Sequence, residues 1–173
     1  MRAAPSVIAL FLTLVFSTLS VSCGVRTVRV IPQRDYLAHE AAIIEKSLTT
    51  AEKSSLVLMT GMDGKTSFSP LLRSHYRDTV PGAILLFRHN IADSAQSVRF
   101  FLSDCDFAFF GLGSPFPALY AIDNEGGDVF RTAGITSRLP SARKVAQCLS
   151  PDRAQDLYRA SGAQLLNLGI GLN

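Results

Sequence analysis

The stretch AIDNEGGDVFR, residues 121–131, is where residue types and spacing first point to chemistry. An apolar run stops at Asp123, and an amide, a second carboxylate and two glycines follow directly. A carboxylate at such a point can accept hydrogen bonds from the hydroxyls of a ligand, and a Gly-Gly pair lets the backbone turn tightly. What Asp123 does therefore depends on the elements that place it.

Three apolar runs of strand length alternate along the chain with segments of helical periodicity. Strands buried on both faces and separated by helices indicate repeated βα units with a parallel sheet, so the fold class is α/β. A long connection through residues 137–147 leads to a last helix with Ser150 as its cap, Pro151 at its first position and Gly169 beyond its end. A fourth strand begins at residues 170–173. The expected strands are residues 55–62, 82–87 and 117–122, and the expected helices are residues 34–48, 69–80, 92–105 and 150–169.

In folds of this kind the residues that face a ligand lie at the carboxyl ends of the strands. Asp123 therefore stands at the mouth of the expected site, and Asp63 and the cluster at residues 88–90 stand on the same rim. Asp63 precedes a glycine, which is typical of a turn, and Asn90 is typical of a cap on the following helix. His89 has no Asp or Ser at a fixed spacing, so the sequence indicates no nucleophile-and-base arrangement.

Two other ligand classes fit the segment after the third strand less well. Asp123, Asn124 and Glu125 carry oxygen ligands, but one short loop supplies too few of them for calcium. The pair Gly126-Gly127 can turn around a phosphate, yet no helix follows directly and the Walker pattern is absent. No metal and no cofactor is expected.

Four segments stand in a distinctive order and spacing, namely SLTTAEKSSLVLMTGMDG, GAILLFRHNI, AIDNEGGDVFR and SRLPSA. In that register they resemble the amino-terminal portion of a glycoside hydrolase family 3 barrel of the β-N-acetylhexosaminidase type. The similarity runs from about residue 47 to the last residue. It implies a partial (β/α)8 TIM-type barrel, with roughly the first three βα units and the start of the fourth strand.

The resemblance also implies a role for the opening stretch. In the family, the Asp of the D-x-E-G-G motif binds hydroxyls of the terminal sugar, and this role maps onto Asp123. Glu125 and the two glycines are expected to shape the loop. The chain departs from the family at Asp128 and His89, where the family usually has Arg, so two positive charges near the site are lost or weakened.

By the same resemblance, no catalytic residue is expected in this chain. A complete barrel needs about 250 residues and eight strands. The family's substrate-gripping Arg and Lys-His pair, its acid/base His and its nucleophilic Asp lie on later segments and have no counterpart here. Retaining glycosidases use two groups at the scissile bond, and nothing in the spacing tunes Asp63 as an acid beside Asp123. A fragment, an interrupted gene or a separate partner that completes the barrel would each explain this.

The amino terminus predicts export. Arg2 is followed by an uncharged apolar stretch of about 15 residues, too short to span a bilayer and typical of a secretory signal. LSVSC resembles a bacterial lipobox, so residues 1–22 are expected to be a signal peptide and Cys23 the lipid-attachment residue of an exported, membrane-anchored lipoprotein of a bacterial cell envelope. An ordinary signal peptide with an incidental Cys23, and an uncleaved membrane helix, stay open. Residues 23–46 would form the tether and leading helix, and residues 47–173 the barrel portion.

Composition and charge limit the classes of partner that the sequence predicts. The 173 residues carry a formal net charge of +3, and Lys and Arg are scattered among Asp and Glu, so nucleic acid is not expected as a partner. The spacing of Cys105 and Cys148 matches no metal pattern. A disulfide between them stays open, and two buried thiols are the favoured state.

Two classes of function remain. In the first, the chain is part of a lipid-anchored glycosidase that removes terminal β-N-acetylglucosamine from cell-wall or related glycans by a retaining mechanism. In the second, it is a non-catalytic surface lipoprotein with a sugar-binding remnant of the fold. The expected partners are a glycan and, through the anchor, a membrane. Open sheet edges near Leu56, Leu58, Leu119 and Ile122 also predict self-association or a complementing barrel fragment.

Overall fold

The computed structural model describes residues 33–173. The chain divides into two compact units, residues 1–44 and 45–173. Helix α2, Gln33–Ser47, confirms the leading helix predicted from the sequence, and its residue His39 is exposed as expected. Among residues 33–173, no helix is both long and apolar enough to cross a membrane. The predicted signal peptide and Cys23 lie outside the described residues.

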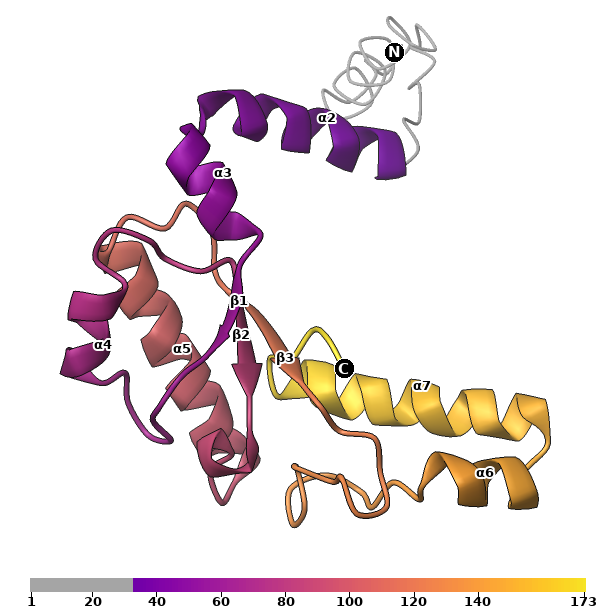
Figure 1. Ribbon diagram of the computed structural model, residues 1–173. Coiled ribbons are helices and arrows are strands. Elements are labelled where there is room, and N and C mark those ends of the chain that lie inside the picture. The colour runs from indigo at the N-terminus through magenta and orange to yellow at the C-terminus, as the bar shows by residue number, and fades with distance from the viewer. Residues whose placement is uncertain (1–32) are drawn as a thin grey trace, which may run out of the picture. The chain divides into compact units, whose positions relative to one another are not determined.

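The second unit is built around a small parallel sheet (Figure 1). Its strands are β1, Met59–Gly61, β2, Ala83–Leu86, and β3, Leu119–Ile122, paired in the order β1-β2-β3. Beyond β3, Leu172 forms a parallel bridge with Ala121, and the backbone N–H of Ile122 donates to the carbonyl oxygen of Leu172 at 3.0 Å. The α/β class, the parallel sheet and the start of further pairing at residues 170–173 are therefore confirmed.

The helices of this unit begin at side-chain caps. Thr49, Ser69, Ser94 and Ser141 each accept a hydrogen bond from a backbone N–H of the first turn that follows them. Ser150 stands at the predicted cap of the last helix but makes no side-chain cap hydrogen bond. The helices are α3, Thr50–Leu56, α4, Pro70–His75, α5, Ala95–Gly111, α6, Ala142–Cys148, and α7, Pro151–Asn167, with a 3-10 helix η1, Arg88–Asn90.

Several elements differ from the sequence prediction. The helix expected at residues 69–80 is α4 and ends at His75, and the helix expected at residues 92–105 is α5 and continues to Gly111. The apolar run at residues 55–62 does not form one strand, because the capping box between Thr49 and Glu52 starts a helix that continues through Leu56 and leaves only a short β1. Residues 137–147 are not a plain connection, since they contain most of α6. This helix was missed because Val145 is its only buried residue, so no apolar stripe marks it.

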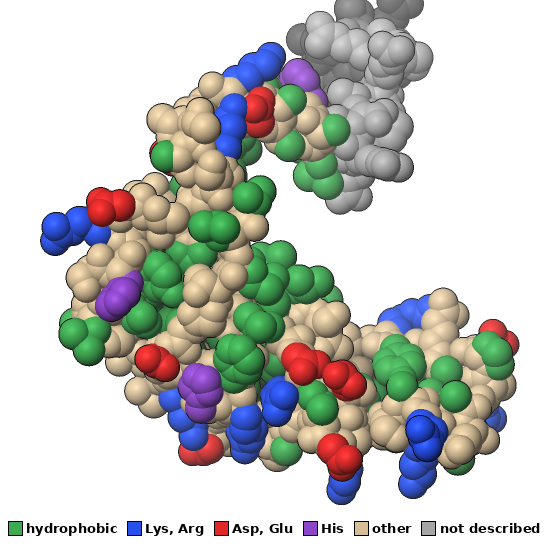
Figure 2. All heavy atoms as spheres, in the orientation of Figure 1, with side chains coloured by type: hydrophobic (Ala, Val, Ile, Leu, Met, Phe, Trp, Pro, Cys, Tyr) green, Lys and Arg blue, Asp and Glu red, His purple; other side chains and the backbone are tan. Residues whose placement is uncertain are grey.

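The two faces of the sheet differ. One face carries Ile84, Leu86, Tyr120 and Ile122, which are each less than 5% exposed and join a core with residues of α5 and of the end of α7. On the other face, Met59, Leu119 and Leu172 share one side by the strand register. These three side chains are 45%, 46% and 45% exposed. In Figure 2, apolar side chains gather over the strands.

The expectation that the strands are buried on both faces therefore holds for β2, whose residues are buried or half-buried, and is wrong at Met59, Leu119 and Leu172. The prediction of open apolar edges near Leu56, Leu58, Leu119 and Ile122 is right for two of these residues and wrong for the other two. Leu58 and Leu119 are exposed, as expected. Ile122 is buried at 2% exposure because it faces the helices, and Leu56 is half-buried because it belongs to α3.

Candidate functional site

The loops that follow the three strands meet at one edge of the sheet, as the parallel order requires (Figure 1). Asp63 follows β1, the η1 segment follows β2, and Asp123 follows β3. Asp63 and His89 are exposed, and the Asp123 side chain is 49% exposed. The structure thus places the sequence-predicted residues on a common rim and leaves the Asp123 carboxylate open to solvent.

Asn90 has a different role from the one predicted. Its side chain is 1% exposed, and its amide donates to the carbonyl oxygens of Met62 at 2.8 Å and Gly64 at 2.9 Å. Its side-chain oxygen accepts from the backbone N–H of Phe87 at 2.8 Å. Asn90 does not cap the following helix, which Ser94 caps, but ties the loop after β1 to the loop after β2.

After β1 the chain bends at residues 65–67, directly behind the predicted turn residues Asp63 and Gly64. Gly64 has a φ of +120°, a conformation that favours glycine, and a side chain there would press on Phe101 and on the carbonyl of Ser67. Beside this turn, Asp63 and His89 line a shallow hollow of the rim. The His89 ring stacks on Phe87 at a centroid distance of 5.8 Å, so its described neighbour is an aromatic ring and not a nucleophile.

The two glycines after β3 fold the loop against the following segment. Gly126 has a φ of +86° and Gly127 a φ of +62°. A Cβ on Gly126 would lie 2.4 Å from the carbonyl oxygen of Pro140, and one on Gly127 would lie 2.8 Å from the Cβ of Ser141. The Gly127 N–H donates to the Leu139 carbonyl at 2.9 Å. This close approach brings the segments DNEGG and SRLPSA into contact.

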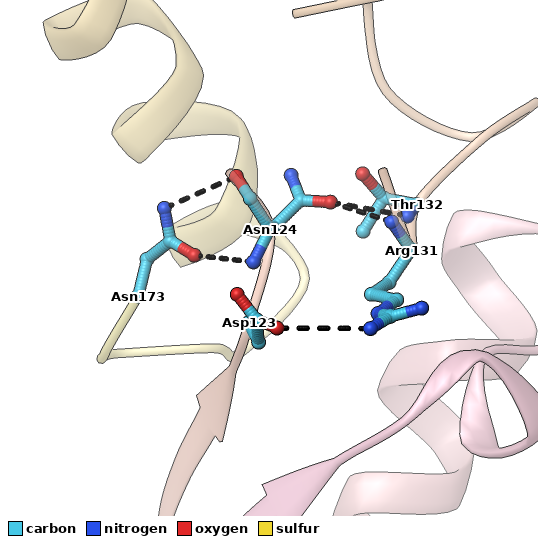
Figure 3. Close-up of polar contacts among 5 residues, drawn as sticks. All are labelled: Asp123, Asn124, Arg131, Thr132 and Asn173. Carbon is cyan, nitrogen blue, oxygen red and sulfur yellow. Dashed lines mark hydrogen bonds and ion pairs between the residues drawn. The ribbon is translucent and has the colours of Figure 1, made fainter. Parts of the chain in front are cut away.

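Asn124 closes the same loop. It is 1% exposed, and its side-chain oxygen accepts from the backbone N–H groups of Arg131 at 2.7 Å and Thr132 at 3.4 Å (Figure 3). Its own N–H donates to the side-chain oxygen of Asn173 at 2.8 Å. The Asn124 oxygen is therefore engaged by the backbone and is not a free cation ligand. Within residues 33–173, no group of three or more His, Cys, Asp or Glu side chains is placed to hold a metal ion.

Arg131 is the residue at this rim that the sequence analysis did not single out. Its guanidinium Nη2 lies 3.6 Å from Asp123 Oδ2, and its side chain is 33% exposed (Figure 3). The Arg131 Nε is buried and has no hydrogen-bond partner among the described residues. No local pattern marks Arg131, because only the loop closed by Asn124 returns it to the end of β3.

The groups with raised pKa values lie elsewhere, where α5 packs on β3. Burial raises the pKa of Cys105 to about 12 and also raises the pKa of Asp106 and of Tyr120. The Tyr120 hydroxyl donates to Asp106 Oδ1 at 2.8 Å, and Asp106 also accepts from the Ala118 N–H at 3.2 Å. Asp106 and Tyr120 are hydrogen-bonded parts of the packing between helix and strand, and Cys105 belongs to the buried core beside them. Cys105 is buried as predicted, whereas Cys148 is exposed, and both are free thiols.

A parallel βα sheet with D-N-E-G-G at the end of its third strand is similar to the amino-terminal portion of glycoside hydrolase family 3. Among solved structures, a family 3 β-N-acetylglucosaminidase from Paenibacillus sp. str. FPU-7 is 25% identical with a TM-score of 0.64, over 71% of this chain and 23% of its own. NagZ from Neisseria gonorrhoeae has a TM-score of 0.54 at 21% identity, over 65% of this chain and 34% of its own, which shows a common fold.

The sequence comparison agrees over a shorter stretch. The curated relative Beta-hexosaminidase LpqI from Mycobacterium tuberculosis (strain ATCC 25618 / H37Rv) is 37% identical over 62 residues, which are 35% of this chain and 16% of the relative. No family model matches the sequence. The chain spans about a sixth of the length of LpqI and about a quarter of the Paenibacillus protein. These matches confirm the resemblance to the amino-terminal portion of glycoside hydrolase family 3.

Proposed function

We propose that this chain supplies the amino-terminal, sugar-binding part of a glycoside hydrolase that removes terminal β-N-acetylglucosamine from cell-wall or related glycans by a retaining mechanism. The observation that carries the proposal is the position of Asp123. Its carboxylate is half-exposed at the carboxyl end of β3, on a loop fixed by Asn124 and the two glycines. The named similarities to β-N-acetylglucosaminidases support the choice of sugar.

Asp123 is assigned to binding and not to bond cleavage. An ionised carboxylate that accepts two sugar hydroxyls makes charge-assisted hydrogen bonds, which are about twice as strong as neutral ones. Retention needs one group that attacks the anomeric carbon and a second that protonates the leaving oxygen. One carboxylate cannot fill both roles, so the proposal places the reacting groups outside residues 33–173.

The proposal also makes the three-stranded sheet part of a larger barrel. Residues 47–173 would form the first βα units of a (β/α)8 barrel, continued through the pairing of Leu172 with β3. The exposed apolar face with Met59, Leu119 and Leu172 would then face the barrel interior and be covered by a complementing barrel segment or a second copy. Solvent exposure of apolar side chains on this face supports such a partner.

For location, we propose export and lipid anchoring, with residues 1–22 as the signal peptide, Cys23 as the acylated residue and residues 23–46 as tether and leading helix. The variant Cys23→Ser should no longer incorporate labelled palmitate and should keep its signal uncleaved. The variant Cys148→Ser is the matched control and should be labelled and processed like the wild type. Unchanged labelling of Cys23→Ser would contradict the anchor.

The binding proposal is tested by titrating the full chain with N-acetylglucosamine and following backbone amide shifts by NMR. Asp123→Ala and Asp123→Asn should each weaken binding by about tenfold or more, because a hydrogen bond to a charged group is lost. Asp128→Ala is the control, since Asp128 is an exposed carboxylate of the same loop. Equal binding by wild type and Asp123→Ala would overturn the proposal. Hydrolysis of a chromogenic N-acetylglucosaminide, measured on the same samples, separates a binding chain from an active one.

A further inference from the structure

The segment that follows β3 encloses a hollow, termed the loop hollow, that the sugar-binding proposal does not use. It has a volume of about 400 Å³ and is lined by Asp128, Phe130 and Arg138, with small residues between them. Small-molecule sites in proteins have volumes of about 300–1,000 Å³. We propose that the loop hollow binds a zwitterionic amino-acid or peptide group, with the ammonium at Asp128 and the carboxylate at Arg138.

The two charged side chains of the loop hollow have opposite signs and do not neutralise each other. Both are exposed, and among residues 33–173 neither takes part in an ion pair. Arg131, on the same loop, pairs with Asp123 instead. A ligand that carries both charges can pair with Asp128 and Arg138 at once, whereas a simple cation or anion meets one attractive and one repulsive side chain.

The backbone that carries the two charges is fixed by hydrogen bonds. The N–H of Gly127, next to Asp128, donates at 2.9 Å to the carbonyl oxygen of the residue that follows Arg138. The N–H of Ser137, on the other side of Arg138, donates at 2.7 Å to the side-chain oxygen of Gln164 on α7. The two sides of the loop hollow are therefore held in place before a ligand arrives, which lowers the entropic cost of binding.

A half-buried ring and a tight turn lie between the charges. Phe130 offers apolar surface to the uncharged part of a ligand. The turn is closed by the Thr136 N–H, which donates to the carbonyl oxygen of the buried Thr132 at 3.2 Å. At Gly134 a Cβ would meet nothing within 4 Å, so this part of the wall is open to a ligand. These features favour a short peptide of small residues, and dialanine is the simplest probe of that class.

The inference goes beyond the proposed function, because binding of a peptide at residues 127–138 requires no sugar at Asp123. The two proposals fit one kind of molecule, since Asp123 and the loop hollow belong to the same segment after β3. A glycan that carries a peptide with a free ammonium and a free carboxylate would engage both.

The test titrates the full chain in detergent micelles with dialanine and follows the backbone amide shifts of Gly127 and Gly134 by NMR. Two modified peptides isolate the two contacts, because N-acetyl-dialanine lacks the ammonium and dialanine amide lacks the carboxylate. Wild type should bind dialanine at least about threefold more tightly than either modified peptide, as expected for one exposed ion pair. High salt should reduce this difference, since salt screens exposed charges.

Variants match each charge of the protein to one charge of the peptide. Asp128→Asn should lower the affinity for dialanine by about threefold to fivefold and leave that for N-acetyl-dialanine unchanged, because this peptide has no ammonium to pair. Arg138→Gln should lower the affinity for dialanine to the same extent and leave that for dialanine amide unchanged. The matched controls Asp152→Asn and Arg143→Gln, at exposed positions of α7 and α6, should bind all three peptides like the wild type.

Equal affinities of the wild type for the three peptides would overturn the proposal. An equal loss of all three in Asp128→Asn or Arg138→Gln would also overturn it, because it would show a general change of the loop and no charge-specific contact. N-acetylglucosamine is titrated separately. A chain that binds dialanine but no sugar would support the loop hollow and contradict the proposed function, and a chain that binds the sugar but no dialanine would do the reverse.

Discussion

The side-chain amide of Asn90 donates to the carbonyl oxygen of Met62 at 2.8 Å, across 28 residues of sequence. A second bond from the same amide, to Gly64 at 2.9 Å, fixes the loop after β1 at two points. The rim of the sheet is therefore held by a buried polar side chain of the neighbouring strand end, and the exposed groups Asp63 and His89 stand on a supported loop.

Replacement of Asn90 by Ala should lower the free energy of unfolding by about 2–3 kcal/mol. The change leaves the buried Met62 carbonyl, and the part-buried Gly64 carbonyl and Phe87 N–H, without their partner. Urea unfolding followed by circular dichroism measures the effect. Asn167→Ala is the control and should change the free energy by less than about 0.5 kcal/mol, because Asn167 is exposed. A neutral Asn90→Ala would show that Asn90 does not tie the two loops.

A methyl group at Gly126 should be much more harmful than one at Gly134. Both glycines have nearly the same φ, +86° and +85°, so the strain of the left-handed backbone is common to the two Ala variants. At Gly126 the new Cβ also meets the Pro140 carbonyl oxygen at 2.4 Å, whereas at Gly134 nothing lies within 4 Å. We expect about 1 kcal/mol of destabilisation for Gly134→Ala and about 3 kcal/mol or more for Gly126→Ala. Similar melting temperatures of the two variants would contradict the close packing of the loop on residues 139–141.

The sequence predicts this part of the fold in outline because the signals are local. The order of residue types alone predicts the three strands from the apolar runs and the strand ends from the polar residues that follow them. It also predicts the tight loop at Gly126-Gly127. The order β1-β2-β3 follows from the alternation of strand and helix. The position of Asp123 at the rim was predictable for the same reason.

What escaped prediction depends on contacts between distant residues. Asn90 resembles a helix cap in the sequence, and only the packing of two strand ends turns its amide toward Met62. Arg131 reaches Asp123 only because Asn124 closes the loop between them. Helix α6 has one buried residue, so it lacks the apolar periodicity that marks the other helices.

Stability should fall at alkaline pH because of Cys105. Its folded-state pKa of about 12 lies above the ordinary value of 9.0, so the folded chain retains a proton that the unfolded chain loses. The contribution is fully present below about pH 9 and is lost as pH rises from there toward 12, at up to about 1.4 kcal/mol per pH unit. Denaturant midpoints at pH 8, 9 and 10 measure the slope.

Cys105→Ala should flatten that slope between pH 9 and 10, before Tyr120, whose ordinary pKa is 10.0, adds its own contribution in the same direction. Cys148→Ser is the matched control and should keep the slope, since Cys148 is exposed. Alkylation by iodoacetamide at pH 8 should modify Cys148 first and reach Cys105 only on unfolding. Equal slopes in wild type and Cys105→Ala would mean that another group dominates the alkaline loss of stability.

The exposed face of the sheet should make the chain self-associate. Met59, Leu119 and Leu172 present apolar surface on one side, and among the described residues β1 pairs with β2 alone, so its outer edge is open. We expect residues 24–173 to sediment as species larger than a monomer. Leu119→Lys should shift them toward the monomer, because a charged side chain in the centre of a buried apolar contact is strongly unfavourable.

The matched control for this prediction is Leu166→Lys, which places the same charge on an apolar side chain of α7 that is 66% exposed but lies on a helix. It should leave the sedimentation profile unchanged, since the helix offers no unpaired strand edge. A wild-type monomer that unfolds cooperatively, or equal dispersal by both variants, would contradict the sheet face as the contact. A complementing barrel segment that covers the face with Met59, Leu119 and Leu172 should suppress association of the wild type. It should have no effect on Leu119→Lys, because the charge blocks binding of the segment to that face.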